Sequence, residues 1–140
     1  MMPLQGRKFR NEFKYYLHLH EYVTLRSKMS KLLRMDDYSI DGEGYGIRSL
    51  YFDGAQDHAL YDKNNGVFKR DKFRIRIYNG SDAKITLERK SKYGEFVCKD
   101  GATLTRAEYD AILSRETDFL QGKEDSLLKE FHNALTHRAL

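Results

Sequence analysis

Basic residues recur at every second position in several stretches of this sequence, a spacing suited to binding phosphate. Residues 68–80 show it most fully, because their alternate positions are cationic or phenolic: Arg70, Lys72, Arg74, Arg76 and Tyr78. The positions between them are apolar: Phe73, Ile75 and Ile77. In an extended strand this spacing puts the cations on one face. Guanidinium groups grip phosphate oxygens in pairs and ammonium groups add mobile charge, so the stretch predicts a strand with an anion-binding face.

Two further stretches repeat the pattern. Residues 8–17 place Arg10, Glu12 and Lys14 on one face, and residues 83–91 place Glu88 and Lys90 opposite an apolar face. A turn at residues 79–82 (Asn-Gly-Ser-Asp) predicts an antiparallel hairpin between residues 68–80 and 83–91. Opposite side chains then lie within about 5.5 Å, so the cations form a two-dimensional grid. A linear chain of phosphates would engage several of them at once.

The same pattern can also be explained without a ligand. The wet face of an antiparallel sheet is normally polar, and Glu88 would neutralise Arg74 or Arg76 across the hairpin. The repetition of the bias in three stretches favours a binding surface. Within it we expect Arg74 and Arg76 to matter most, and Arg70 and Lys72, nearer the start of their strand, to lie at the rim or in solvent.

Hydrophobic periodicity and capping signals predict the elements that position these residues. Further strands are expected at residues 47–53 and 95–99. Helices are expected at residues 20–35, 56–63, 106–115 and 126–137, the third of them starting from a capping box at Thr105 and Glu108. The predicted fold class is therefore α+β, an antiparallel sheet with flanking helices.

Composition limits the kind of protein. The chain has 140 residues, a formal charge of +4 and a single cysteine, Cys98. Its length suits one domain over residues 1–140, and one cysteine fits a reducing compartment. No apolar run reaches membrane-spanning length and the first residues lack the apolar core of a signal peptide. We predict a cytoplasmic protein without a membrane segment.

Four motifs together resemble a known family. "RNEFKYYL", "RSLYFD", "KFRIRIY" and "TLERKSK" occur in this order and resemble the first half of the VTC (vacuolar transporter chaperone) domain. This is the polyphosphate polymerase branch of the triphosphate tunnel metalloenzymes, in the CYTH-like group. The resemblance implies that the curved sheet forms part of a triphosphate-tunnel barrel, whose inner wall binds triphosphate or a growing polyphosphate.

The resemblance also implies roles for individual residues. It implies catalytic roles for Lys14, Arg74, Arg76 and Lys90. It implies substrate-binding roles for these four and for Lys99. Arg10 and Tyr78, which the alternation places on the cationic side of their strands, complete the expected substrate-binding set. Glu12 and Glu88 face the same wall and are the candidate metal ligands. The implied reaction transfers the γ-phosphate of ATP to polyphosphate, with Mn²⁺ or Mg²⁺ bridging phosphate oxygens.

Several alternatives stay open at the level of sequence. The family's tunnel has more strands than this chain offers, so the chain is either a fragment, the N-terminal portion of a tunnel domain, or a short relative that completes its barrel as a homodimer. It is an enzyme, a polyphosphate polymerase-like phosphotransferase, if the tunnel is complete. The rival functions are a non-catalytic polyanion-binding or sensing module and a triphosphatase. Most aromatic residues fall on the apolar face, Tyr16 and Tyr78 excepted, so nucleic acid is not the expected ligand.

Overall fold

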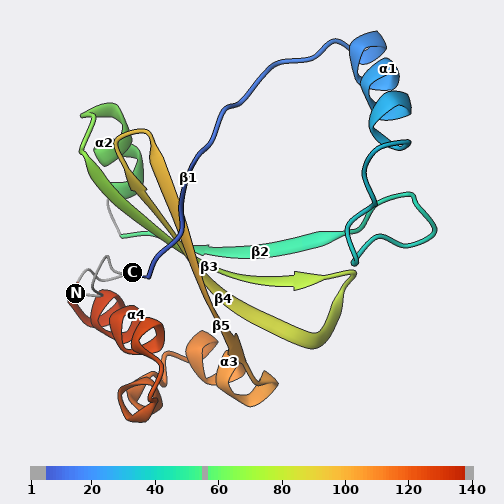
Figure 1. The fold of residues 1–140 in the computed structure, drawn as a ribbon. Coiled ribbons are helices and arrows are strands. Elements are labelled where there is room, and N and C mark those ends of the chain that lie inside the picture. Colours follow the sequence, from blue (N-terminus) through green and yellow to red (C-terminus); the bar gives the residue numbers. More distant parts are fainter. Residues whose placement is uncertain (1–5, 55–56, 138–140) are drawn as a thin grey trace. The chain divides into compact units, whose positions relative to one another are not determined.

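The computed structural model describes residues 6–54 and 57–137 and shows an α+β chain, as predicted (Figure 1). The strands are β1 (Phe9–Asn11), β2 (Ile47–Phe52), β3 (Lys69–Tyr78), β4 (Ser81–Tyr93) and β5 (Phe96–Leu104). The helices are α1 (Leu19–Met29), α2 (His58–Asn64), α3 (Arg106–Leu113), the 3₁₀ helix η1 (Asp118–Gly122) and α4 (Ser126–His137). Two compact units result: residues 13–46, and the remainder of the chain.

The larger unit is built on one antiparallel sheet with the strand order β1-β5-β4-β3-β2. The predicted hairpin between β3 and β4 is confirmed, since Tyr78 pairs with Ser81 across Asn79 and Gly80. Both turn residues have positive φ, 52° and 66°, as the two-residue turns that match the twist of a hairpin require. The register shifts at a β-bulge between Arg76 and Tyr78, and beyond this bulge Arg74 lies directly opposite Glu88.

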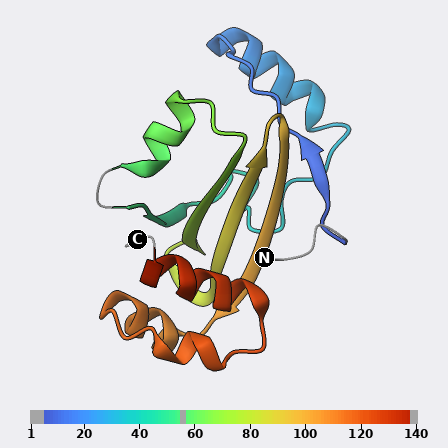
Figure 2. The same cartoon turned by 90° about the vertical axis from the view of Figure 1, so that its left-hand side faces the viewer.

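One face of the sheet carries the hydrophobic core. Phe73, Ile75, Ile85 and Leu87 are buried there, as their alternation predicts. Side chains of α3, η1 and α4 pack against them: Ile112, Leu120, Leu127, Leu128, Phe131 and Ala134. Figure 2 shows α4 lying across the strands. These three helices therefore cover one face of the sheet, and they do not cover the opposite face.

The capping box before α3 is present as predicted. The Thr105 hydroxyl accepts a hydrogen bond from the Glu108 amide at 3.2 Å, and the Glu108 carboxylate accepts one from the Thr105 amide at 2.9 Å. Both partners belong to the start of the helix, so the connection from β5 into α3 is fixed locally. Helix α4 has the predicted bounds, and β2 ends one residue earlier than expected.

Several predicted boundaries are wrong. Strand β4 spans Ser81–Tyr93 where residues 83–91 were predicted, and α3 ends at Leu113 where residue 115 was predicted. The strand predicted at residues 8–17 ends at Asn11, because Asn11 pairs with Phe96, the first residue of β5, and no further β5 residue is left to pair. The strand predicted at residues 95–99 continues to Leu104, because pairing with β4 overrides the weak strand propensity of Asp100 and Gly101. The helix predicted at residues 20–35 ends at Met29. For the helix predicted at residues 56–63, residue 56 lies outside the described residues, and α2 begins at His58.

The sheet is open within the described part of the chain. Strands β1 and β2 lie at its two edges, and each pairs with one neighbour. A closed barrel is therefore not confirmed, whereas the antiparallel sheet with helices on one face is.

The smaller unit, residues 13–46, contains α1. The Glu21 carboxylate accepts a hydrogen bond from the His18 amide at 2.8 Å and so caps the first turn of the helix. Helix α1 has no buried residue. Across residues 6–54 and 57–137, no helix is long and apolar enough to cross a membrane.

Candidate functional site

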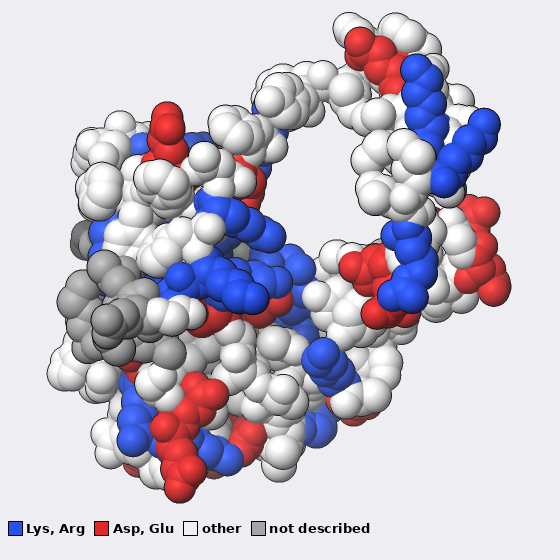
Figure 3. Space-filling model, in the orientation of Figure 1, with Lys and Arg blue, Asp and Glu red and all other residues white. Residues whose placement is uncertain are grey.

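The face of the sheet opposite the core gathers the predicted cations. Pairing registers place these side chains on it, and we call the set the cationic face: Arg10, Arg70, Lys72, Arg74, Arg76, Lys90, Lys92 and Lys99, with the carboxylates Glu12 and Glu88. Figure 3 shows a group of blue side chains gathered on the larger unit, with red side chains bordering it. Only two carboxylates accompany the eight cations of this set, so the cationic face carries a strong positive surplus.

Glu88 lies at the centre of one end of this face. Its Oε2 accepts a hydrogen bond from Arg74 Nε and an ion pair from Arg74 Nη2, both at 2.6 Å. Its Oε1 accepts from Lys99 Nζ at 3.2 Å, and Arg76 Nε lies 3.9 Å from Oε2. The charge pairing across the hairpin is confirmed. One carboxylate thus orients three cations that come from two different strands, β3 and β5.

Hydroxyl groups of β2 hold the two arginines from the other side. Tyr51 lies opposite Arg74 in the β2–β3 pairing, and its oxygen accepts a hydrogen bond from Arg74 Nη1 at 3.1 Å. Ser49 lies opposite Arg76 and accepts from its Nε at 3.4 Å. Both guanidinium groups are therefore fixed in position before any ligand binds, which reduces the ordering cost of binding. The sequence reading missed Ser49 and Tyr51, because their role depends on the pairing of β2.

The other predicted residues fall into three places. Lys90 Nζ contacts both oxygens of Glu12, at 2.9 and 2.7 Å, so β1 and β4 are joined on the cationic face. Arg10 pairs with Val97 of β5 and is exposed. Tyr78 lies at the hairpin end, opposite Ile47. Lys14 belongs to the smaller unit and is described only there.

The electrostatics of Glu88 and Tyr51 reflect the arginine between them. Burial alone would raise the pKa of Glu88, but the hydrogen bond and charge of Arg74, helped by Lys99, outweigh it and the pKa is lowered. The hydrogen bond from Arg74 lowers the pKa of Tyr51, against a smaller opposing effect of burial. Burial would lower the pKa of Arg74, but its bonds to Tyr51 and Glu88 raise it. Arg74 is therefore a permanent cation on this face.

The two candidate metal ligands are already paired. Both oxygens of Glu88 face Arg74 and Lys99, and both oxygens of Glu12 face Lys90. Within the described residues, no three or more His, Cys, Asp or Glu side chains gather in a way that could hold a metal ion.

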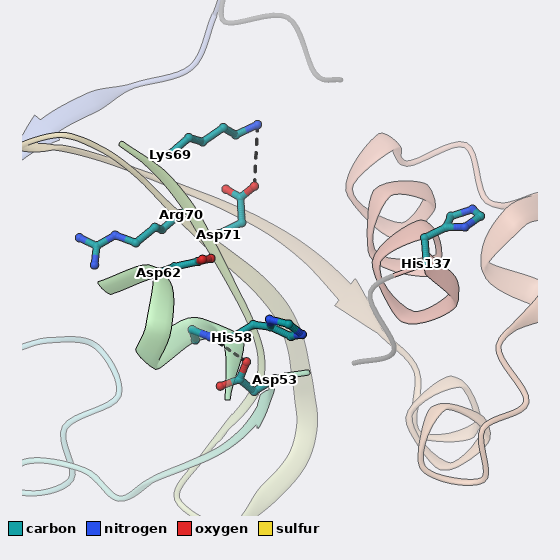
Figure 4. Close-up of a pocket in the computed structure, with 8 residues that line it drawn as sticks. Asp53, His58, Asp62, Lys69, Arg70, Asp71 and His137 are labelled. Atoms are coloured by element: carbon teal, nitrogen blue, oxygen red, sulfur yellow. Dashed lines mark hydrogen bonds and ion pairs between the residues drawn. The ribbon is translucent and has the colours of Figure 1, made fainter. Parts of the chain in front are cut away.

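A separate hollow lies beside β3, near α2 and α4. Its lining includes Asp53, His58, Lys69, Asp71 and His137. Figure 4 shows that the Arg70 side chain points away from those of Lys69 and Asp71, as alternation along β3 requires. Asp53 serves the local fold, because its Oδ1 accepts from the Gly54 and Ala59 amides at 2.8 and 3.1 Å. The predicted phosphate-contacting residues do not converge on this hollow.

A second group of charges lies on the core face of the same strands and escaped the sequence reading. Arg89 is 4% exposed; it bonds Asp100 at 2.9 Å and pairs closely with Glu130 of α4. Arg7 Nη2 bonds the same Asp100 at 2.5 Å. The available signal was parity, since Arg89 is in phase with Ile85 and Leu87, whose side chains point into the core. Its partners could not be read from the sequence, because they depend on the β4–β5 register and on the packing of α4.

These features define an α+β domain with one face of its sheet covered by helices and the other exposing positive charge. The family model for the VTC domain matches residues 9–140. The chain belongs to the VTC domain family, as its motifs suggested, which relates it in general terms to polyphosphate. No curated protein and no solved structure was found to match it.

Proposed function

We propose that the cationic face binds a chain of phosphates: polyphosphate, triphosphate or the phosphate tail of a nucleotide such as ATP. The observation that carries this proposal is the imbalance of eight cations against two carboxylates on one face of the sheet. Membership in the VTC family supports the choice of phosphate over other polyanions. A ligand with closely spaced negative groups can form ion pairs with several of these cations at the same time.

The geometry suggests a division of labour among the cations. Arg74 and Arg76 are held by Glu88, Tyr51 and Ser49, so they supply fixed positive charge in a defined direction. Lys90 and Lys99 are less constrained, since their side chains are 37% and 45% exposed. They can follow a ligand whose phosphates are not evenly placed. Arg10, Lys14 and Tyr78 remain part of the proposed binding set.

In its complete form, we propose that the domain transfers the γ-phosphoryl group of ATP to polyphosphate. A terminal oxygen of the polyphosphate forms a bond to the γ-phosphorus, the bond from that phosphorus to the β–γ bridging oxygen breaks, and ADP leaves. Fixed cations stabilise the charge of the transferring group, which is the main requirement of phosphoryl transfer. Lys14, Arg74, Arg76 and Lys90 are the proposed catalytic cations.

A divalent ion, Mn²⁺ or Mg²⁺, is part of the catalytic proposal and would neutralise charge on the non-bridging phosphate oxygens. Because Glu12 and Glu88 are both paired with cations, such an ion would depend mainly on phosphate oxygens for its ligands. The same pairing favours a second candidate function, a non-catalytic polyanion-binding or sensing module that uses the same cations without a protein-held metal.

Binding is tested first. Isothermal titration calorimetry with tripolyphosphate at low ionic strength should show binding to the unaltered protein and a loss of at least about tenfold in Arg74→Ala with Arg76→Ala. The matched control is Arg34→Ala with Arg106→Ala, which also removes two arginines, each paired with exposed aspartates. If the unaltered protein does not bind tripolyphosphate, the proposal that the cationic face binds phosphate chains is wrong.

Turnover is tested separately by incubating the protein with ATP and Mn²⁺ and following polyphosphate and free phosphate. Polyphosphate supports the transferase, and free phosphate alone supports a triphosphatase. Binding without either product supports the non-catalytic module. Repeating the reaction with Lys90→Ala checks that any product comes from this face.

Self-association is a further part of the proposal. Strand β2 is a regular edge strand of six residues, and within the described chain it pairs only with β3. Such an edge can pair with a second copy, which would make a homodimer with a continuous sheet. Sedimentation velocity over a range of protein concentrations measures this, and a monomer throughout that range would contradict it.

A further inference from the structure

The hollow beside β3 has features of a binding site of its own. Strand β2 ends at Phe52, opposite Phe73, so within the described chain β3 has no partner strand on that side from Lys69 to Lys72. The hollow there has a volume of about 450 Å³. It adjoins a second hollow of about 300 Å³ along α4, and Asp71 lines both. Together they are large enough for a small organic molecule.

Asp71 is the buried acid of this site. Its side chain is 10% exposed, and its Oδ1 is buried without a hydrogen-bond partner in the described part of the chain. Its Oδ2 lies 3.8 Å from Lys69 Nζ, which is an ion pair but too long for a hydrogen bond. A buried carboxylate oxygen without a donor is unfavourable. Asp71 therefore calls for a donor that the described residues do not supply.

Two further carboxylates line the same hollow. Asp62 of α2 makes no side-chain hydrogen bond or ion pair with another described residue. Asp53 uses Oδ1 to accept from two backbone amides, which leaves Oδ2 to accept from another group. Figure 4 shows Asp53 and Asp62 on the α2 side of the hollow, Asp71 on β3 and His137 on α4. Carboxylates from three elements thus retain acceptor capacity around one space.

The two cations of the lining do not neutralise this group closely. Lys69 Nζ lies 5.7 Å from the centroid of the Tyr93 ring, a cation–π contact that competes for its charge. The Arg70 side chain points away from that of Asp71 (Figure 4). The hollow is therefore an acidic site on a protein whose formal charge is +4. Nonspecific attraction of a cationic ligand to the whole molecule is correspondingly weak.

The chemistry of the lining favours an organic amine over a metal ion. Among residues 6–54 and 57–137, no group of three or more His, Cys, Asp or Glu side chains could hold a metal ion. An ammonium group brings several N–H donors, which is what the open carboxylate oxygens lack. Methylene groups can lie against the apolar side chains of the lining, which include Ala59, Phe73 and Ala134.

We propose that this hollow binds an aliphatic polyamine, a linear carbon chain that carries two or more ammonium groups. One ammonium group donates to Asp71, and another lies against Asp53 and Asp62. The site is separate from the proposed phosphate-binding function and does not depend on it.

The experiment measures binding by isothermal titration calorimetry at low ionic strength. The probes are spermidine, a linear triamine, and n-butylamine, which carries a single ammonium group. The proteins are the unaltered chain, Asp71→Asn, Asp62→Asn and a matched control, Glu124→Gln. Each variant removes one negative charge. Glu124 is exposed and precedes α4, at the opposite end of that helix from His137.

We expect the unaltered protein to bind spermidine at least about tenfold more tightly than n-butylamine, because only spermidine can reach both acidic positions. Asp71→Asn should weaken spermidine binding by at least about tenfold, since it removes a buried charged acceptor. Asp62→Asn should weaken it by about threefold, because Asp62 is more exposed. The control should bind as the unaltered protein does. Tripolyphosphate, titrated without amine, should bind Asp71→Asn and the unaltered protein equally.

Several results would overturn the polyamine site. Absence of spermidine binding, equal affinity for the two amines, or an equal loss in Glu124→Gln would each contradict it. Circular dichroism checks that Asp71→Asn is folded, and if it is not, Asp62→Asn decides, because the Asp62 side chain has no partner among the described residues. Full spermidine affinity in that variant would overturn the proposal. Loss of tripolyphosphate binding by a folded Asp71→Asn would also overturn it, because the hollow would then belong to the phosphate site.

Discussion

The two faces of the sheet use arginine in opposite ways. On the core face, Arg7 and Arg89 are matched by Asp100 and Glu130. On the cationic face, Arg74 and Arg76 share one carboxylate, Glu88, and further cations surround them. Charge on the first face is balanced and buried, which is how a fold accommodates charge in its interior. The second face carries surplus positive charge, which is the basis of the proposed phosphate binding.

The largest loss of stability should come from breaking the ion pairs of the core face. Arg89→Ala leaves Glu130 without its cation and leaves Asp100 with Arg7 alone, so the expected loss lies at the lower end of the range for breaking a buried pair, about 3 kcal/mol. Urea denaturation followed by circular dichroism measures the loss. A change below about 1 kcal/mol would show that the core-face network does not stabilise the fold.

A smaller effect on stability is expected from the cationic side. Arg74→Ala with Arg76→Ala should lower the free energy of unfolding by about 1–2 kcal/mol. The loss stays small because Glu88 becomes accessible to water and keeps its ion pair with Lys99. The same denaturation experiment gives the comparison with Arg89→Ala. If the two losses are equal, the cationic face is structural and the contrast between the faces fails.

Acid should weaken the Glu88 end in a defined direction. The folded-state pKa of Glu88 lies below its ordinary value of 4.5, so the stability that its ionisation contributes is fully present above that pH. It is lost as the pH falls through the lower, folded-state pKa. The difference in unfolding free energy between the unaltered protein and Glu88→Gln should therefore shrink below pH 4.5. A difference that stays constant on acidification would contradict the ionised pairing with Arg74.

The smallest expected effect is spectroscopic. The hydrogen bond from Arg74 lowers the pKa of Tyr51, so a phosphate that takes over Arg74 should let that pKa rise again. Ultraviolet titration of the phenolate, taken as the difference between the unaltered protein and Tyr51→Phe, isolates this one side chain. Tripolyphosphate should shift the difference curve to higher pH. An unmoved curve in the presence of bound ligand would mean that the ligand does not contact Arg74.

The sequence predicted the part of the site that local rules determine. Strict alternation was enough to place Arg74 and Arg76 on one face, and the turn after Tyr78 was enough to predict that β4 pairs with β3. The partner of Arg74 also depends on a β-bulge between Arg76 and Tyr78, which shifts the register so that Glu88 lies opposite. The capping box placed α3 in the same way. Each of these features depends on residues close together in the chain, so no knowledge of distant packing was needed.

The remainder depends on partners far apart in sequence. The extent of β1 is set by where β5 begins, which cut the predicted strand short and left Lys14 outside the sheet. The row through Lys72, Lys90 and Lys99 exists only because β5 pairs with β4 in one register. The partner of Arg89 on α4 lies 41 residues away. Periodicity identifies the face of a residue, but it does not identify the neighbour on another strand or helix.

The buried Cys98 can report how often this part of the sheet opens. Cys98 is the sole cysteine of the chain, is 2% exposed, and lies between Phe9 of β1 and Ser91 of β4. A thiol reagent reaches it only when this part of the sheet opens, so the labelling rate at saturating reagent equals the opening rate. Because Lys90 and Glu12 tie β4 to the end of β1, Glu12→Gln should speed that labelling. The labelling rate of Cys98 therefore measures how often the short edge strand β1 separates from β5.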